Sequence, residues 1–139
     1  MNNDVTSCYD AEAIVSRNTY QKIAKFNQDR NWDQFHTPKD LSISISLEAA
    51  ELLECFQWSG SDLHVHQKKE KIIEETADIL IYALQMCQVL KIDPEEIIKN
   101  KLAQNELKYP ADKAYGSALK YTELQRLPEK QDSPDGTDK

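Results

Sequence analysis

Apolar residues recur at the spacing of one helix face over most of the chain, which predicts an all-α fold. Four main helices are expected, at about residues 10–30, 41–57, 68–90 and 93–109. The expected inward residues of the first helix are Ile14, Tyr20, Ile23 and Phe26. The stretch 31–40 contains Pro38, a helix breaker, and is interpreted as a connector.

The segment LSISISL at 41–47 alternates apolar and polar residues as a half-buried strand would. A longer window favours a helix instead, because its apolar residues are spaced by three or four positions. These positions are Leu41, Ile45, Ala49, Leu52 and Phe56. We therefore expect one helix here, ended by the SGSD stretch at 59–62.

The third helix carries apolar residues around most of its circumference and is expected to be the most buried one. One apolar stripe consists of Ile73, Ala77, Leu80, Leu84 and Cys87, and the other of Ile72, Ile79, Ala83, Met86 and Leu90. The fourth helix begins at DPEE, residues 93–96. Asp93 suits the N-cap, Pro94 the first turn and Glu96 a capping box.

Composition narrows the class of protein. The chain has 139 residues, and we divide it into a flexible N-terminus (1–9), one domain (10–127) and a disordered tail (128–139). The formal net charge of −7, without a local basic stripe, argues against nucleic acid as a partner. The sequence contains no run of about 18 apolar residues, so it predicts no membrane-spanning helix. Three scattered cysteines and the lack of a signal peptide favour the cytoplasm.

Glycine is rare in this chain. Only Gly60, Gly116 and Gly136 occur, and they are far apart. P-loop and dinucleotide-binding motifs both need clustered glycines, so no glycine-rich phosphate loop is present. If the protein handles phosphates, it must bind them through metal ions and side chains.

Acidic residues stand three apart on two of the apolar helices: Glu48 and Glu51 on the second, Glu75 and Asp78 on the third. Residues at this spacing share a helix face, with about 5–6 Å between Cβ atoms. Packed antiparallel, the two helices would bring four carboxylates together, and their repulsion would require a cation. Mg²⁺, or alternatively Mn²⁺, suits oxygen ligands. Acid pairs on solvated helix faces are common, so spacing alone leaves both interpretations open.

Other catalytic or metal sites have less support. A di-iron carboxylate bundle needs Glu-x-x-His motifs, and neither His36, His64 nor His66 follows a glutamate by three residues. His64 and His66 offer a zinc pair, but no cysteine or third histidine is near in sequence, so a solvated loop is favoured. No nucleophile elbow marks a Ser-His-Asp or Cys-His set, although sequence alone leaves such a set open.

Several stretches resemble, in order and spacing, the MazG-like all-α nucleoside triphosphate pyrophosphohydrolases, and among them the dCTP pyrophosphatase branch. They are WDQFHTPKDL (32–41), ELLECFQW (51–58), ADILIY (77–82), KLAQNELKYP (101–110) and GSALKYTEL (116–124). The resemblance covers about residues 12–124 and includes the paired acids. It implies a four-helix bundle assembled as a dimer of dimers, and Mg²⁺-dependent conversion of dCTP to dCMP and pyrophosphate.

The resemblance also implies residue roles. Glu48, Glu51, Glu75 and Asp78 would be the metal ligands and catalytic acids. Trp32, His36 and Trp58 would form the pocket for base and sugar, and Tyr82, Lys101 and Asn105 would contact sugar or phosphates. Glu54 and Glu74 are candidates for a supporting acid or general base, or are simply solvated. Without the family, Trp58 and Tyr82 would be interpreted as core residues.

Two rival functions stay open. Another all-α pyrophosphohydrolase, specific for dUTP, dATP or phosphoribosyl-ATP, would share the acids. A catalytically inactive helical interaction protein would share only the fold. Some dCTP-preferring members carry a histidine nine residues before the pocket tryptophan, where this chain has Ile23, so the base preference is an open question.

Overall fold

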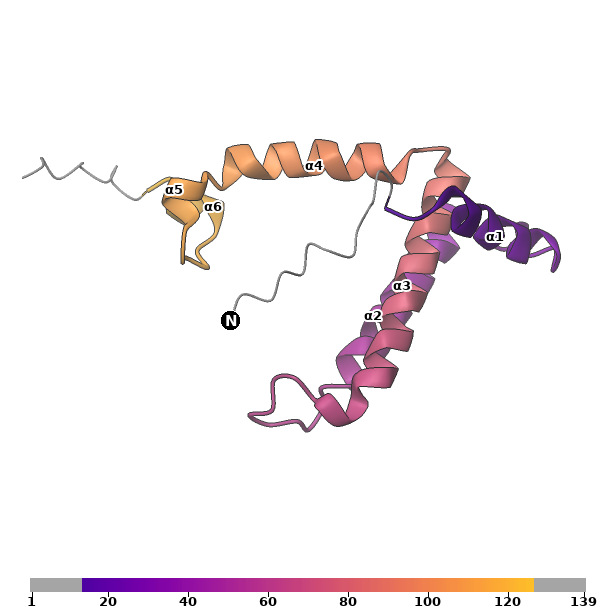
Figure 1. Ribbon diagram of the computed structural model, residues 1–139, viewed down its shortest axis with the longest axis horizontal. Coiled ribbons are helices and arrows are strands. Elements are labelled where there is room, and N and C mark those ends of the chain that lie inside the picture. The colour runs from indigo at the N-terminus through magenta and orange to yellow at the C-terminus, as the bar shows by residue number, and fades with distance from the viewer. Residues whose placement is uncertain (1–13, 127–139) are drawn as a thin grey trace, which may run out of the picture. The chain divides into compact units, whose positions relative to one another are not determined.

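The computed structural model describes residues 14–126, and every regular element in this range is a helix. In chain order these are α1 (Arg17–Gln28), α2 (Pro38–Glu54), the 3-10 helix η2 (His66–Lys68), α3 (Lys69–Leu90), α4 (Pro94–Lys108), α5 (Ala111–Ala114) and α6 (Tyr121–Leu124) (Figure 1). The predicted all-α fold with four main helices is confirmed over the described residues. The predicted N-terminal segment 1–9 and tail 128–139 lie outside them.

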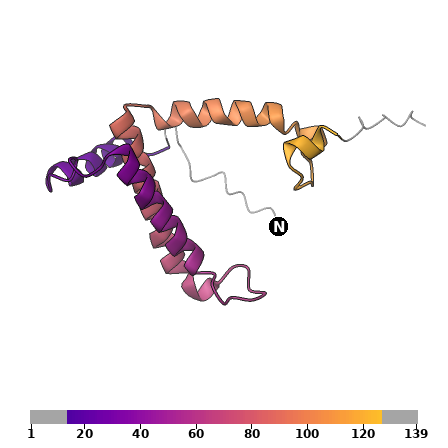
Figure 2. The same ribbon diagram turned by 180° about the vertical axis from the view of Figure 1, so that it is seen from behind.

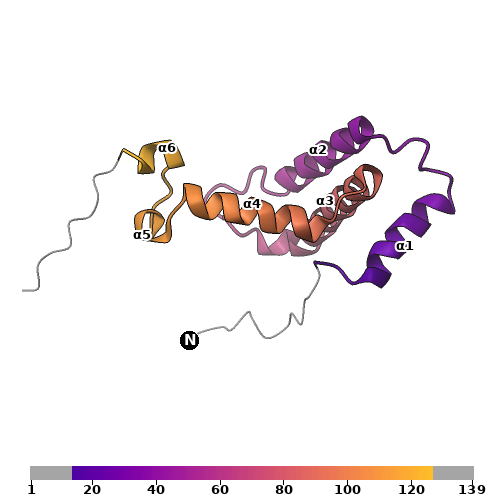
Figure 3. The same ribbon diagram turned by 90° about the horizontal axis from the view of Figure 1, so that it is seen from above.

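The described chain divides into two compact units between Ile97 and Ile98. In the first unit, α2 and α3 run antiparallel along each other and are joined at one end by the loop that follows α2 (Figure 2). α1 packs against α3, and a short connector leads from α1 to α2 (Figure 3). The second unit contains most of α4 together with α5 and α6. A bundle that includes α4, and a dimer of dimers, stay predictions.

α1 begins at Arg17, later than the expected residue 10, and residues 14–16 are not helical. Ser16 caps it, because its Oγ accepts the backbone N–H of Thr19 at 3.2 Å. The expected inward face was also partly wrong, since Phe26 is 47% exposed and Asn27 is buried. Burial of this amide is tolerated because Asn27 accepts a hydrogen bond from Gln85 on α3.

α2 begins at Pro38, so the assignment of this proline to a connector was wrong. Thr37 is the N-cap, and its Oγ1 accepts the N–H of Asp40 at 3.2 Å. Proline is tolerated in the first turn because the N–H it lacks would have no partner within the helix. α2 ends at Glu54, three residues before the expected end at 57, and turns occupy residues 55–58.

α3 matches its predicted range within one residue and contributes four buried residues, more than any other helix of the described chain. Leu84 and Cys87 lie in the core. The earlier part of the same stripe is not covered, because Ile73 and Leu80 are 56% and 55% exposed. The apolar stripe of α3 is therefore covered at Leu84 and Cys87 and open at Ile73 and Leu80.

α4 begins and ends within one residue of its prediction. Oδ1 of Asp93 accepts the N–H of Glu95 at 2.9 Å, as expected for an N-cap aspartate. No helix within residues 14–126 combines the length and the apolar content needed to cross a membrane.

Candidate metal centre and adjoining pocket

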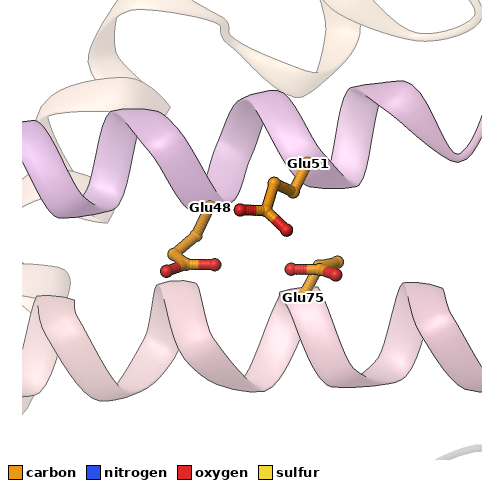
Figure 4. A group of neighbouring side chains, drawn as sticks. All are labelled: Glu48, Glu51 and Glu75. Carbon is orange, nitrogen blue, oxygen red and sulfur yellow. The ribbon is translucent and has the colours of Figure 1, made fainter.

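Three carboxylates converge between α2 and α3. Glu48 and Glu51 extend from α2 toward Glu75 on α3 (Figure 4), and one oxygen of each lies within 4.8 Å of the others. The spacing of three places Glu48 and Glu51 on one face of α2, and the close packing of α2 on α3 brings that face to Glu75. Three of the four carboxylates that the sequence pairs on the two helices thus come together, and Asp78 is not among them.

The cluster carries more negative charge than its neighbours neutralise. Glu75 is only 6% exposed, and its Oε1 lies 3.0 Å from Nζ of Lys71. The hydrogen bond and charge of Glu75 hold the pKa of Lys71 above its ordinary value. Burial raises the pKa of the Glu48 carboxyl, and the charges of Asp78, Glu51 and Glu75 raise it further. Burial and the neighbouring charges therefore oppose ionisation of Glu48.

The sequence analysis did not identify Lys71 as a site residue. The signal was its position four residues before Glu75, the spacing at which oppositely charged side chains meet on a helix. The salt bridge therefore holds one carboxylate oxygen of Glu75.

The donor set fits a hard divalent cation. The three gathered ligand atoms are all carboxylate oxygens, which Mg²⁺ and Mn²⁺ prefer. The carboxylates repel one another, which raises the pKa of Glu48. A divalent ion would reduce this repulsion. Among residues 14–126, this trio is the group of acidic, histidine or cysteine side chains that lie close enough together to share a metal ion.

The histidine pair does not form a comparable group. The rings of His64 and His66 stack, with centroids 5.6 Å apart, but no third ligand gathers with them in the described part of the chain. Oδ1 of Asp62 accepts the N–H groups of His64 and Val65 at 3.1 and 3.0 Å, and these hydrogen bonds lower the pKa of Asp62. Asp62 therefore organises the loop, in keeping with the solvated loop expected here.

Asp78 connects the acid cluster to a pocket. It is not one of the three gathered carboxylates, but its charge acts on Glu48 more strongly than that of any other neighbour. It also lines a cavity of about 330 Å³ between α1, the connector and α3. Acid cluster and cavity are thus adjacent parts of one site within the first unit.

Aromatic side chains form one wall of this pocket. The predicted binding residues Trp32, His36 and Tyr82 all line it, together with Phe26. Neighbouring rings meet edge to face, with centroids 5.8 Å apart for Phe26–Trp32, 6.3 Å for Trp32–His36 and 6.4 Å for His36–Tyr82. Nδ1 of His36 is buried and has no hydrogen-bond partner within residues 14–126. An orphaned buried nitrogen beside a cavity indicates room for a polar ligand group.

Two polar residues of the pocket were also missed. Asn27 and Gln85 are each 4% exposed, and Nε2 of Gln85 donates to Oδ1 of Asn27 at 3.3 Å. Polar residues on amphipathic helices normally face water, so their pattern predicts exposure. The available signal was that Gln85 interrupts the apolar run of the most buried helix.

The remaining predicted site residues lie elsewhere. Trp58 has a left-handed backbone (φ 67°), is 92% exposed and does not line the pocket. Glu54 and Glu74 are exposed and stand outside the carboxylate trio. Lys101 and Asn105 are on the part of α4 that belongs to the second unit. The roles implied for these five residues stay predictions.

Comparisons with known proteins identify the family of the chain. Residues 43–124 match the model of the MazG-like family. Curated relatives named dCTP pyrophosphatase 1 are 33% identical over 108 residues in Mus musculus, covering 74% of this chain and 64% of the relative. The Homo sapiens protein is 34% identical over 106 residues, covering 73% and 62%. The chain thus spans slightly less than two thirds of the length of these relatives.

A solved structure is also similar to this chain in fold and sequence. A pyrophosphatase from Archaeoglobus fulgidus is 44% identical, with a TM-score of 0.63, over 67% of this chain and 90% of the other. The family model itself matches more than half of the 139 residues. The chain belongs to the MazG-like family.

Proposed function

We propose that the protein is a Mg²⁺-dependent nucleoside triphosphate pyrophosphohydrolase that converts dCTP to dCMP and pyrophosphate. The observation that carries this proposal is the convergence of Glu48, Glu51 and Glu75 beside an aromatic pocket, with Asp78 between them. Relatives named dCTP pyrophosphatase 1 support the choice of substrate. On this proposal the protein acts in the cytoplasm, in sanitation of the nucleotide pool.

Glu48, Glu51, Glu75 and Asp78 would hold the Mg²⁺, or alternatively Mn²⁺. When bound, the ion would stabilise charge on the phosphate oxygens and make a bound water more acidic. The chain supports this by holding its ligands in place: α2–α3 packing brings the trio together, and the salt bridge from Lys71 orients Glu75. Glu54 and Glu74 remain candidates for the general base.

The order of the site favours attack at the α-phosphorus. Trp32, His36 and Tyr82 would surround the base and sugar in the pocket, and Asp78 is the carboxylate among the residues that line it. The α-phosphate is the phosphate closest to the sugar, so it would be the first to reach the acid cluster. Water attack there leaves a monophosphate and releases pyrophosphate. Lys101 and Asn105 would add contacts to sugar or phosphates.

The exposed apolar surface supports an assembly of several chains. Leu47 and Leu53 on α2 are 58% and 71% exposed, and Ile73 and Leu80 on α3 are more than half exposed. Large apolar side chains left open on the two central helices are typical of a surface that another chain covers. We propose a homo-oligomer, a dimer of dimers as the family resemblance implies.

A product analysis tests the proposed reaction. The purified protein is incubated with Mg²⁺ and dCTP, dUTP, dATP or CTP, and the products are separated by chromatography. We expect dCMP and pyrophosphate, with dCTP the best substrate, 5-substituted dCTP analogues accepted and ribonucleotides poorer. Release of dCDP and orthophosphate would exclude the reaction, and a faster rate on dUTP or dATP would overturn the base assignment.

Two substitutions serve as controls for the metal centre. Glu51→Gln and Asp78→Asn remove one ligand charge each with almost no change of side-chain volume. Both should abolish hydrolysis while leaving the helical circular dichroism spectrum near that of wild type. Full activity in either variant would contradict the metal centre. No turnover of any nucleotide by the wild type, with Mg²⁺ or Mn²⁺, would favour the inactive interaction protein.

A further inference from the structure

The pocket also contains two buried amide side chains. Both Asn27 and Gln85 line the cavity. Gln85 uses Nε2 to bond Asn27, whereas its Oε1 is buried and has no hydrogen-bond partner within the described chain. A buried acceptor without a partner costs stability, and most such groups in proteins are satisfied. An unpaired oxygen beside a cavity therefore indicates a ligand that donates a hydrogen bond to it.

We propose that this amide pair binds the amino edge of the cytosine base, an inference that rests on the proposed function. Because the two side chains share one hydrogen bond, Gln85 presents its Oε1 as an acceptor, and Asn27 has the N–H donors of its Nδ2 left to offer. Cytosine matches this pattern with its N4 amino donor and its N3 acceptor. Uracil has the reverse pattern, a carbonyl at position 4 and a donor at N3, and would set its carbonyl against Oε1.

The place of the pair along α3 agrees with the length of a nucleotide. Asp78, Tyr82 and Gln85 are four and three residues apart, so they share one face of the helix. Gln85 is seven positions after Asp78, which is about 10 Å along the helix axis. The face therefore presents an acid, then an aromatic ring, then an amide, in the order of phosphate, sugar and base.

A purely structural role for Gln85 would be to tie α1 to α3. Gln88 already makes such a tie one turn further along α3, because its Nε2 donates to the backbone oxygen of Tyr20 at 2.9 Å. Gln88 does not line the pocket. It is therefore a matched control for Gln85: the same residue type, on the same helix, bonded to the same neighbouring helix, but outside the cavity.

The experiment measures base preference in three variants. Gln85→Leu removes the polar atoms at similar volume, the double variant Asn27→Ala/Gln85→Leu leaves no unpaired amide, and Gln88→Leu is the control. For each, kcat/KM is measured for dCTP and dUTP, and binding of dCMP and dUMP by calorimetry. In Gln85→Leu and in the double variant, here called the pair variants, we expect two ratios to fall by about tenfold or more: kcat/KM for dCTP over dUTP, and affinity for dCMP over dUMP. A loss of this size is within the range of one amide–base contact. In Gln88→Leu the ratios should stay at the wild-type value.

Retained dUTP hydrolysis in the pair variants shows that the acid cluster and fold are intact. Unchanged ratios in a folded pair variant overturn the proposal and leave the proposed reaction standing. An equal loss of preference in Gln88→Leu also overturns it, because the pair would then act only as a tie between helices. If the double variant does not fold, Gln85→Leu alone carries the same expectation.

Two further outcomes separate this inference from the proposed function. A wild type that prefers dUTP overturns the assignment to cytosine. That preference would mean that both amide groups are rotated by half a turn, so that Gln85 presents its Nε2 donor to the carbonyl at position 4 of uracil. If the wild type hydrolyses no nucleotide, the monophosphates still test the pair. Tighter binding of dCMP than dUMP, lost in the pair variants, would then support the amide pair while the reaction failed.

Discussion

Glu48 is the residue at which the electrostatics of the site can be measured without a substrate. Its pKa is raised above the ordinary 4.5 by burial and by three neighbouring carboxylates. Between 4.5 and the raised value, the folded chain binds more protons than the unfolded chain. The metal-free protein should therefore lose stability as the pH rises through this window. The lowered pKa of Asp62 has the opposite effect on stability: its contribution is lost only as the pH falls below the ordinary pKa of 3.8.

Replacing Glu48 with glutamine should remove this pH dependence. In the absence of divalent metal, Glu48→Gln should melt at a higher temperature than wild type near pH 7, and the difference should shrink toward pH 4.5. Thermal melts from pH 4 to 8 measure it, with Glu74→Gln, an exposed acid of α3 that stands outside the carboxylate trio, as the control. A lower melting temperature for Glu48→Gln at every pH would contradict the repulsive cluster.

The residues of the site differ in how well sequence predicts them. The trio Glu48, Glu51 and Glu75 could be predicted because acids at helical spacing in apolar helices have few ways to stay solvated. Asn27 and Gln85 could not, because an amide is unremarkable on an amphipathic helix until the partner that buries it is known. A pairing 58 residues apart in sequence leaves no local signal.

At the scale of the element, α2 holds two of the three gathered acids, and its start depends on Thr37. Thr37→Ala removes the cap on the N–H of Asp40 and should lower the free energy of unfolding by about 1 kcal/mol, with a range of about 0.5–2. Urea unfolding measures the change. Thr37→Ser keeps the hydroxyl and should stay near wild type, and an equal loss in both variants would show that the cap is not the cause.

Helix ranges were predictable where the apolar pattern was long. α3 and α4 match within one residue because each combines an extended stripe with clear end signals. The start of α2 was misplaced because Pro38 was interpreted as a breaker, although threonine followed by proline is also a helix-start signature. The choice between these meanings depends on whether Thr37 caps the next turn, which the structure shows.

At the scale of the whole molecule, the open apolar side chains of α2 and α3 predict an oligomer. Light scattering at micromolar concentration should give a mass well above the 16.0 kDa of one chain, near four times that value for a dimer of dimers. Leu53→Glu and Leu80→Glu place a charge on exposed positions and should shift the mass downward. A clean monomer for the wild type would contradict the assembly.

The oligomeric state is also the property that the sequence predicts least directly. The apolar circumference of α3 indicates more surface than one small chain covers, but it does not identify the covering surface. Residues such as Ile73 and Leu80 carry the same pattern as the buried Leu84, and only the packing of α1 and α2 separates the open positions from the covered ones.

The most direct test of the account is hydrolysis of dCTP in water enriched in oxygen-18, with Mg²⁺ present. In the proposed binding mode the α-phosphate lies nearest the acid cluster, so water should attack the α-phosphorus. The label should then appear in dCMP and not in pyrophosphate, as mass spectrometry of the two products will show. Label in pyrophosphate would place the attack at the β-phosphorus and contradict the arrangement of acids and pocket proposed for this chain.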